Sequence, residues 1–524
     1  MGIYINKGNE AFRSNRKGEY VDKSGLISIV NETIGTRNRF SCVSRCRRFG
    51  KSMAAEMLAA YYDKSCDSRL LFQDLEISGA PSFEEHLNKY PVIYLDMTGF
   101  VTRFRNDGIV SHIDREVKED ICAAYPQIEV KDEDDLMGAL IRIAAATGNR
   151  FFFIIDEWDA ICREFPTSSP AMERYVDWLR RMFKDGSAIS VFSGVYMTGI
   201  LPIKKYNTQS ALNNFQEYSM IDPGEMAPFF GFTSKEVEQL AQRRDMDYAE
   251  LQKWYDGYRI GDEQSIFNPN SVMQAIRRHR CTGYWSKTGA YETIVPYIKM
   301  NYDGLKDDII VLLGGGSVKV KPKSFGNDLS VIKSKDDALT AMIHLGYLSY
   351  DCDSGSCQVP NYEVMEEMEN AVNDTGWTRL AEALKDSEKL LKATLAGDEE
   401  AVSRGVEAAH DENTSILSYN NENSLACVLS LAFYYARNDY VIHRELATGK
   451  GFADLVLIPR KNVESPVIIA ELKYNHSADT AIDQIRRKEY PAKLAQYQGD
   501  LLLVGINYDR ETKTHSCRIE RLAK

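Results

Sequence analysis

Residues 40–62 read FSCVSRCRRFGKSMAAEMLAAYY, and this stretch decides the fold. It opens with a short β-prone segment and closes with good helix formers whose apolar side chains recur at helical spacing. Between them lies a basic turn that ends in Gly50-Lys51-Ser52. A strand, such a turn and a Lys-Ser pair at the start of a helix are typical of a loop that binds phosphate.

Each residue type in this turn has a chemical role. Gly50 lets the backbone approach a phosphate, while the helix start offers free N–H groups and a positive dipole end. Lys51 would reach the β- and γ-phosphates of ATP, Ser52 would ligate Mg²⁺, and Arg48 is a further nucleotide-binding candidate. The full motif has glycine where this chain has Arg45. Either guanidinium groups supplement the loop's backbone donors, or Gly-Lys-Ser begins this helix by chance.

A second segment favours the nucleotide interpretation. Residues 151–155, FFFII, predict a strand buried on both faces, and Asp156-Glu157 follow at its carboxyl end, where doubly wound folds hold ligands. Asp156 would hold Mg²⁺, usually through water, and Glu157 would polarise the attacking water. The alternative is that both acids only cap the next helix. Ser193 or Thr198, farther along, is a candidate γ-phosphate sensor, although the position of either residue favours a turn role.

Composition limits the class of protein. The 524 residues suffice for two to four domains, and 44% hydrophobic with 27% charged residues is ordinary for a globular chain. No apolar run reaches the roughly 18 residues of a membrane span, and no signal core is present, so we expect a cytoplasmic protein without a membrane partner. The ten cysteines lack zinc-ligand spacing and fit reduced thiols. The net charge of −12 argues against indiscriminate coating of nucleic acid but not against a local basic groove.

Strands and helices alternate through the first half of the chain, which predicts a parallel sheet with right-handed crossovers. After Phe229 the pattern becomes mostly helical, starting with a helix capped by Thr233 or Ser234. The aromatic residues at 254, 255 and 258 fit the core of this helical region better than a ligand platform. The predicted strands are 90–97, 151–155 and 188–193, and the predicted helices are 110–125, 133–147, 171–184 and, as a bridge, parts of 363–410.

A second chemical centre is predicted near the C-terminus, after an apolar helix over 424–437. Residues 451–475 predict two strands around a polar loop, 460–465. If the hairpin closes symmetrically, Asp454 faces Glu471 with Cβ atoms about 5 Å apart. Lys473 then projects from the same face as Glu471, because side chains alternate along a strand.

Two acids and a lysine on one sheet face suit metal-dependent hydrolysis of phosphodiesters. Asp454 and Glu471 would bind Mg²⁺, and Lys473 would orient water or add positive charge. Gln484, on a helix predicted from 478 to 489, would support this face. The alternative is that these are solvated strand residues, but Glu and Lys at the end of an apolar strand are costly to bury without a purpose.

Together these segments resemble a family of bacterial AAA-ATPase-like proteins with a C-terminal PD-(D/E)XK nuclease domain. The resemblance implies an ATPase core with Gly50, Lys51 and Ser52 in the phosphate loop and Asp156-Glu157 as its acid pair. It also implies a nuclease site with Asp454, Glu471 and Lys473, supported by Gln484. This chain has Cys46 where the family usually has proline and Trp158 where it has tyrosine, while the missing loop glycine is shared. The segments that carry the likeness are, in order, YVDKSGLI, RCRRFGKS, YPVIYLDM, FIIDEWDA, SGVYMTGI, SALNNF, FGFTSKEV, WYDGY, FNPNSV, LGYLSY, VPNYEV, GFADLVL, IIAELKY and IDQIRRKEY.

We therefore expect an α/β protein with four parts: a P-loop ATPase core over 1–228, a helical middle domain over 229–362, a helical bridge over 363–415 and a restriction-endonuclease-like α/β domain over 416–524. The expected function is an ATP-binding ATPase coupled to a Mg²⁺-dependent nuclease that acts on nucleic acid, with DNA preferred over RNA and a homo-oligomer allowed. The alternative is a slow nucleotide-dependent switch whose C-terminal domain only binds. A structural helical protein with chance motifs is a third hypothesis.

Overall fold

The structure is a computed structural model, and it forms two compact units. Unit 1 comprises Met1–Ala290 and Lys319–Glu366, and unit 2 comprises Tyr291–Val318 and Glu367–Lys524. The described residues are 2–104, 108–165, 169–203, 205–206, 209–210, 212–285, 304–327, 329, 331–374, 378–413, 429, 432–433, 436, 439–448, 451–459, 463, 465–487 and 500–522.

Unit 1 is built on a five-stranded sheet in the order β2-β3-β4-β1-β7, with all paired strands parallel. The predicted parallel sheet is therefore confirmed. Strand β4 lies between β1, which leads into the Gly-Lys-Ser turn, and β3, which carries the FFFII run. Because these strands are parallel, β1 and β3 end at the same edge of the sheet. The strands are β1 (Phe40–Ser44), β2 (Val92–Asp96), β3 (Phe151–Asp156), β4 (Phe192–Gly199) and β7 (Gln216–Tyr218).

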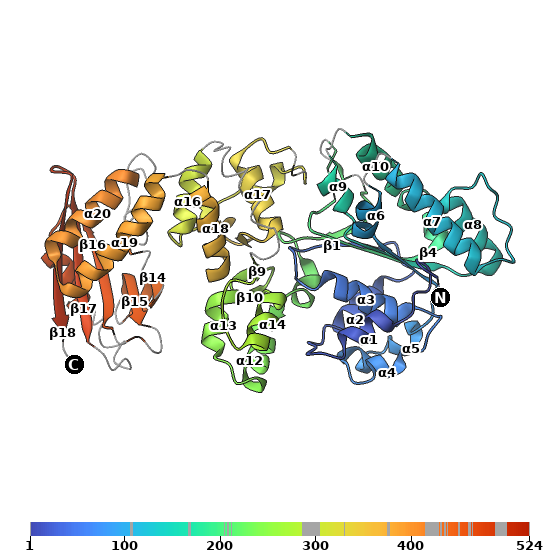
Figure 1. Cartoon of the computed structure of the whole chain (residues 1–524), viewed down its shortest axis with the longest axis horizontal. Helices are drawn as coiled ribbons and strands as arrows, with labels where there is room; N and C mark the ends of the chain where they lie inside the picture. Colours follow the sequence, from blue (N-terminus) through green and yellow to red (C-terminus); the bar gives the residue numbers. More distant parts are fainter. Residues whose placement is uncertain are drawn as a thin grey trace. The chain divides into compact units, whose positions relative to one another are not determined.

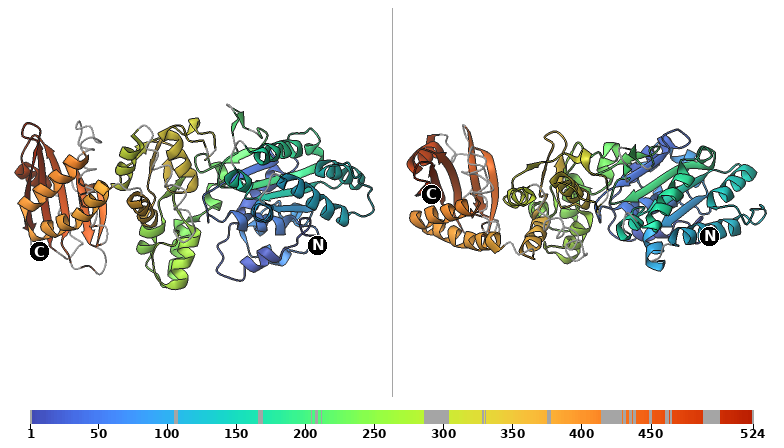
Figure 2. Two further views of the ribbon diagram at one scale, coloured as in Figure 1. Left: turned by 45° about the horizontal axis from the view of Figure 1, so that its top comes forward. Right: turned by 90° about the horizontal axis from the view of Figure 1, so that it is seen from above.

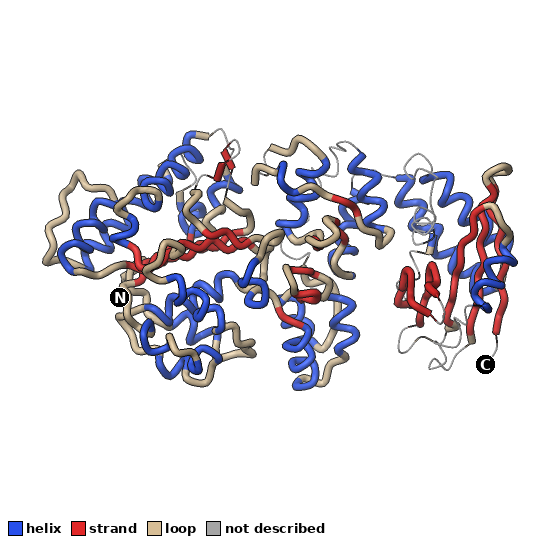
Figure 3. The backbone as a smooth tube through the Cα atoms, turned by 180° about the vertical axis from the view of Figure 1, so that it is seen from behind, coloured by secondary structure: helices blue, strands red, loops and turns tan. Residues whose placement is uncertain are grey.

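Helices cover both faces of this sheet (Figures 1 and 3). One apolar cluster joins β1, β3 and β4 to α2 and α3, and another joins the opposite face to α6 through α10. Burial on both sides explains why β3 is an uninterrupted apolar run. The first layer holds α1 (Glu10–Asn15), α2 (Gly25–Thr33), α3 (Lys51–Tyr62), α4 (Arg69–Phe72) and α5 (Phe83–His86), and the second α6 (Met97–Arg103), α7 (Ile109–Ala124), α8 (Leu136–Thr147), α9 (Ala160–Glu164) and α10 (Pro170–Phe183).

The strand predicted over 188–193 is placed differently. Residues Ala188–Val191 form a short helix, α11, and β4 begins only at Phe192 and runs to Gly199. Gly194 interrupts the apolar pattern from which the strand would be recognised. A glycine is required at this position because a Cβ there would lie 2.6 Å from the ring of Phe152. A glycine inside a strand often marks such a close approach.

The rest of unit 1 is mostly helical and includes the antiparallel sheets β8-β10-β9 and β5-β6 and the sheet β11-β13-β12, in which β12 and β13 are antiparallel. Helix α12 begins after Thr233, which forms a capping box with Glu236, as the sequence predicts. Tyr255 and Tyr258 are buried, which confirms the core interpretation for these two residues, whereas Trp254 is half-buried against the apolar cluster that contains Tyr255. The elements are β5 (Lys205–Tyr206), β6 (Gln209–Ser210), β8 (Phe232–Thr233), α12 (Ser234–Arg243), α13 (Tyr248–Tyr255), β9 (Tyr258–Ile260), β10 (Glu263–Phe267), α14 (Pro269–Arg278), β11 (Val318–Lys319), α17 (Lys335–Leu345), β12 (Ser349–Asp351) and β13 (Ser356–Gln358).

Unit 2 contains a five-stranded sheet in chain order, β14-β15-β16-β17-β18, antiparallel except for the parallel pair β16–β17. Helix α22 makes the crossover between those two strands and packs on both. Helices α19 and α20 lie against one face of this sheet (Figure 2) and share an apolar cluster with it, and α22 shares another cluster with the sheet. The elements are α16 (Leu305–Leu313), α18 (Tyr362–Asp374, which begins in unit 1), α19 (Thr378–Ala396), α20 (Glu399–Asn413), β14 (Tyr440–Thr448), β15 (Gly451–Pro459), β16 (Val467–Tyr474), α22 (Ala478–Arg487), β17 (Leu501–Asp509) and β18 (Thr514–Leu522).

Candidate functional sites

The turn between β1 and α3 has the geometry of an anion-binding loop. Gly50 adopts φ +88°, a left-handed conformation that favours glycine, and α3 starts at the next residue. The described contacts include no side-chain cap at this helix start, so the first-turn N–H groups face the loop. Ser52 lies in that first turn and is exposed.

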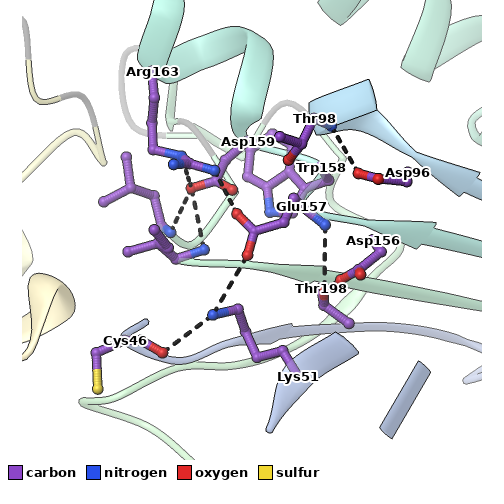
Figure 4. A network of polar contacts seen from close by, with 12 residues as sticks. Cys46, Lys51, Asp96, Thr98, Asp156, Glu157, Trp158, Asp159, Arg163 and Thr198 are labelled. Carbon is purple, nitrogen blue, oxygen red and sulfur yellow. Dashed lines mark hydrogen bonds and ion pairs between the residues drawn. The ribbon is translucent and has the colours of Figure 1, made fainter. Parts of the chain in front are cut away.

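Lys51 is almost completely buried and points across the loop toward β3. Its Nζ donates to the Cys46 carbonyl at 3.1 Å and lies 3.7 Å from Oε1 of Glu157 (Figure 4). The predicted loop lysine and the predicted water-polarising acid, 106 positions apart in the chain by their residue numbers, are thus neighbours. The structure brings together the two halves of the predicted nucleotide site.

Asp156 lies at the buried carboxyl end of β3 and is held by hydroxyl groups. Thr198 donates to Oδ1, Tyr94 donates to Oδ2 at 3.1 Å, and the Ser52 side chain is a third hydrogen-bond partner. Burial raises the pKa of Asp156, and the Thr198 and Ser52 hydrogen bonds lower it in part. A hydroxyl and a carboxylate in direct contact are oxygen donors of the kind that Mg²⁺ prefers, so Ser52 and Asp156 fit the predicted metal.

The two sensor candidates have different positions on β4. Thr198 contacts both predicted acids, because its Oγ1 donates to Asp156 and accepts from the backbone N–H of Glu157 at 3.2 Å. Ser193 donates to the Phe151 carbonyl at the other end of β3. The position of Ser193 therefore excludes a contact with a nucleotide bound at Lys51, while Thr198 remains a candidate.

Glu157 is engaged by a basic residue that sequence reasoning missed. Arg163, on α9, donates from Nη2 to Oε2 of Glu157, and its Nε lies 3.3 Å from Oδ2 of Asp159. Asp159 is fully buried and accepts from the N–H groups of Ile200 and Leu201 at 3.1 and 3.0 Å. The spacing of Arg163, one helical turn after Asp159, could have indicated its ion pair with Asp159 but not its contact with Glu157.

The interpretation that guanidinium groups supplement the loop is wrong for Arg45. This side chain is fully buried, donates to the carbonyls of Ser44 and Tyr218 at 2.9 Å, and lies over the Phe230 ring at 5.3 Å. Burial lowers the pKa of Arg45 to about 10. Arg48 is exposed with φ +67°, and its role in nucleotide binding stays a prediction.

In unit 2 the hairpin register agrees with the symmetric closure expected from the sequence. Leu455 pairs with Ala470, Val456 with Ile469 and Leu457 with Ile468. The next positions in this register are Asp454 and Glu471, where the ladder ends. Oδ2 of Asp454 accepts from the Leu472 N–H at 2.8 Å, which holds its carboxylate beside the backbone that carries Glu471.

The other two predicted residues converge on Glu471. Its side chain is 2% exposed, and its Oε1 lies 3.4 Å from Nζ of Lys473 and also accepts from Nε2 of Gln484. Gln484 reaches Glu471 from α22, so the site combines two strands and the crossover helix. The structure therefore gathers Asp454, Glu471, Lys473 and Gln484 in one place.

The donor set for metal at this second site is small. Among the described residues, no group of three or more His, Cys, Asp or Glu side chains is close enough to hold a metal ion. A buried glutamate beside a strand-end aspartate still fits Mg²⁺, which is commonly bound by one or two carboxylates and keeps several waters.

The helix predicted over 424–437 falls mostly outside the described residues, as does most of the loop 460–465. No described helix is long and apolar enough to cross a membrane.

Comparisons with known proteins agree with this two-part organisation. Residues 8–208 match the family model described as a predicted AAA-ATPase, and residues 420–517 match that of the PD-(D/E)XK nuclease superfamily. No curated protein matches the chain significantly.

Solved structures similar to the chain include three proteins from two organisms. They are the Aeropyrum pernix ORC2 protein in ADPNP–ADP complexes (11% identity, 70% of this chain and 98% of that one, TM-score 0.31), Cdc6p from Pyrobaculum aerophilum (8%, 67% and 93%, 0.25) and A. pernix ORC1 in complex with DNA (12%, 72% and 99%, 0.22).

Proposed function

We propose that this chain, which joins a domain of the predicted AAA-ATPase family to a domain of the PD-(D/E)XK nuclease superfamily, is an ATP-hydrolysing protein whose C-terminal domain cleaves phosphodiester bonds of nucleic acid. Both reactions are hydrolyses at phosphorus with Mg²⁺ as the expected metal. The chain supplies a separate set of oxygen ligands and one lysine for each.

The ATPase half is supported by one observation above all: Lys51, Ser52, Asp156 and Glu157 meet at the edge where β1 and β3 end. Lys51 would bind the β- and γ-phosphates, and Ser52 and Asp156 would hold Mg²⁺. When bound, the metal would neutralise the phosphate charge. Glu157 would accept hydrogen bonds from the attacking water and align it with the γ-phosphate.

The nuclease half is supported by the β15–β16 register together with the contacts of Glu471. Asp454 and Glu471 would hold Mg²⁺, which would activate water and stabilise charge on the scissile phosphate. Lys473 would bind a phosphate oxygen or the water, and Gln484 would restrain the Glu471 carboxylate. The preference for DNA over RNA, a homo-oligomeric state, the cytoplasmic location and the domain boundaries at 228, 362 and 415 stay predictions.

Coupling is the third element of the proposal. ATP binding in unit 1 would control cleavage by unit 2, so that the phosphodiesterase acts only in one nucleotide state. The alternative, a slow switch with a purely binding C-terminal domain, predicts ATP binding without cleavage. The Asp454, Glu471 and Lys473 set favours the catalytic version, because a binding domain has no need for a buried glutamate beside a lysine.

The test is a matrix of cleavage assays on single- and double-stranded DNA and RNA, with and without Mg²⁺ and with ATP, ADP or neither. We expect Mg²⁺-dependent cleavage that Asp454→Ala and Lys473→Ala each abolish, while the exposed-residue variant Glu511→Ala keeps it. Lys51→Ala should abolish ATP binding in a titration. Equal ATP binding by wild type and Lys51→Ala would reject the loop assignment, and absence of cleavage in every cell of the matrix would favour the binding alternative.

A further inference from the structure

The side chain of Glu157 is held between two cations, one for each oxygen. Lys51 Nζ lies 3.7 Å from Oε1, and Arg163 Nη2 donates to Oε2 (Figure 4). The backbone at this residue is also fixed, because the Glu157 N–H donates to Thr198 Oγ1 and the Trp158 N–H donates to the Thr198 carbonyl at 2.8 Å. Glu157 has φ +53°, a left-handed conformation that a non-glycine residue keeps only when its surroundings enforce it.

A bound nucleotide would affect the contacts of Lys51 and Arg163 with Glu157 differently. Lys51 starts α3, and a triphosphate bound at the α3 N-terminus would compete with Glu157 for its ammonium group. Arg163 is anchored on its other side by Asp159, which is fully buried and tied to the N–H groups of Ile200 and Leu201 just after β4. A phosphate that attracts Lys51 would therefore leave the Arg163 contact in place.

Arg163 is also suited to its position chemically. A guanidinium presents donors on several sides of one plane, so it can bridge Glu157 and Asp159 at once, whereas an ammonium is a point charge. Burial by itself would lower the pKa of Arg163, but the Asp159 and Glu157 carboxylates raise it, so the group stays charged.

We propose that Arg163 is a positioning residue that keeps the Glu157 carboxylate aligned for the attacking water once Lys51 has turned to the nucleotide, with Asp159 as its fixed anchor. This inference rests on the proposed ATPase function. It assigns to Arg163 an effect on turnover that passes through Glu157 and leaves nucleotide binding largely unchanged.

The test is a double-mutant cycle on the full-length chain. Arg163→Met should lower kcat for ATP hydrolysis roughly 10- to 100-fold, because misplacement of a catalytic group by about 1 Å has that effect. The Kd for a non-hydrolysable ATP analogue should change less than about threefold. In a Glu157→Gln background, with a radiolabelled assay sensitive enough to resolve that rate, Arg163→Met should cause no further loss, because residues that act as a unit are non-additive.

Two further variants make the result decisive. Arg163→Lys keeps a cation beside the buried Asp159 and should recover part of the lost kcat, and it carries the test if the methionine variant does not fold. Arg180→Met removes an arginine from an exposed ion pair with Asp177 on α10 and should leave kcat unchanged. Additive losses in the Glu157→Gln background, or a loss of analogue affinity as large as the loss of kcat, would assign Arg163 a merely structural role and overturn the proposal. If the wild-type protein binds ATP but never hydrolyses it, both the proposed ATPase function and this inference are refuted. If wild type hydrolyses ATP and Arg163→Met is equally active, only the inference about Arg163 is refuted.

Discussion

Replacement of Gly505 by alanine tests how α22 is seated on the nuclease-like sheet. Gly505 lies on β17, and a Cβ at this position would be 2.3 Å from the Ala478 carbonyl oxygen and 3.1 Å from the Ala481 Cβ. The obstacle is the backbone at the start of α22, which cannot rotate away as a side-chain end can. The helix would have to move by about 1 Å to restore normal van der Waals contact.

The expected cost follows from this geometry. Overpacking a rigid contact destabilises a protein by about 1–3 kcal/mol, and we expect that loss in the unfolding free energy of Gly505→Ala from urea denaturation. Because α22 carries Gln484, the shift also moves the amide that donates to Glu471. If the proposed cleavage activity is present, it should fall about 10- to 100-fold, since a 1 Å misplacement at a catalytic site has effects of that size.

Gly405→Ala on α20 is the matched control. Its added Cβ would lie 2.5 Å from Leu390 Cδ1, but the obstacle is the end of a flexible side chain, and alanine favours a helix over glycine by about 1 kcal/mol. We expect its unfolding midpoint to stay near that of wild type. A Gly505→Ala variant as stable as Gly405→Ala would refute the close approach of α22 to β17.

Three other perturbations have defined outcomes. Burial raises the pKa of Glu363 from 4.5 to about 7, so the folded state favours the protonated carboxyl and stability falls as pH rises through that interval. Between pH 5 and 8.5 the unfolding free energy of wild type should therefore drop roughly 2–3 kcal/mol more than that of Glu363→Gln, and parallel pH curves of the two proteins would contradict this. Thr198→Val removes the donor to Asp156 and the acceptor for the Glu157 N–H, so we expect a loss of about 1–3 kcal/mol in denaturation and slower ATP hydrolysis, and an unchanged variant would exclude Thr198 as a sensor. Gly231→Ala places a Cβ 2.2 Å from Ile266 Cγ2 at a residue with φ +92°, and it should make the middle region of unit 1 more sensitive to limited proteolysis, whereas wild-type resistance would show that the site tolerates a side chain.

The sequence predicts a strand of the unit 1 sheet correctly where the strand is a continuous apolar run, the pattern of a strand buried on both faces. The FFFII run predicts β3 because a strand covered by helices on both faces has no polar alternation. It fails at β4, where Ser193 and Gly194 interrupt the apolar pattern because Phe152 occupies the space that a side chain at 194 would need. That requirement arises from a neighbouring strand and has no local signature.

The candidate sites show the same division. The hairpin register follows from counting out from its loop, so the positions of Asp454 and Glu471 could be derived from the sequence. The contact of Arg163 with Glu157 could not, because it depends on where α9 lies after the turn that follows β3. The buried position of Arg45 could not be predicted either. A basic residue in a phosphate loop suggests a phosphate ligand, but the Arg45 guanidinium points inward and contacts carbonyl groups and the Phe230 ring.

The loop that ends in Gly50 is clamped by residues far along the chain. The Gly231 N–H donates to the Phe49 carbonyl, the Phe49 ring packs edge-on against Tyr258 at 5.1 Å, and the Tyr258 hydroxyl donates to the Gly346 carbonyl at 2.8 Å. A fragment that stops at residue 228 would lose these partners and expose Phe49 to water, so we expect it to aggregate on expression. Biochemists who wish to isolate the nucleotide-binding part should retain the chain through residue 366, where the compact unit ends.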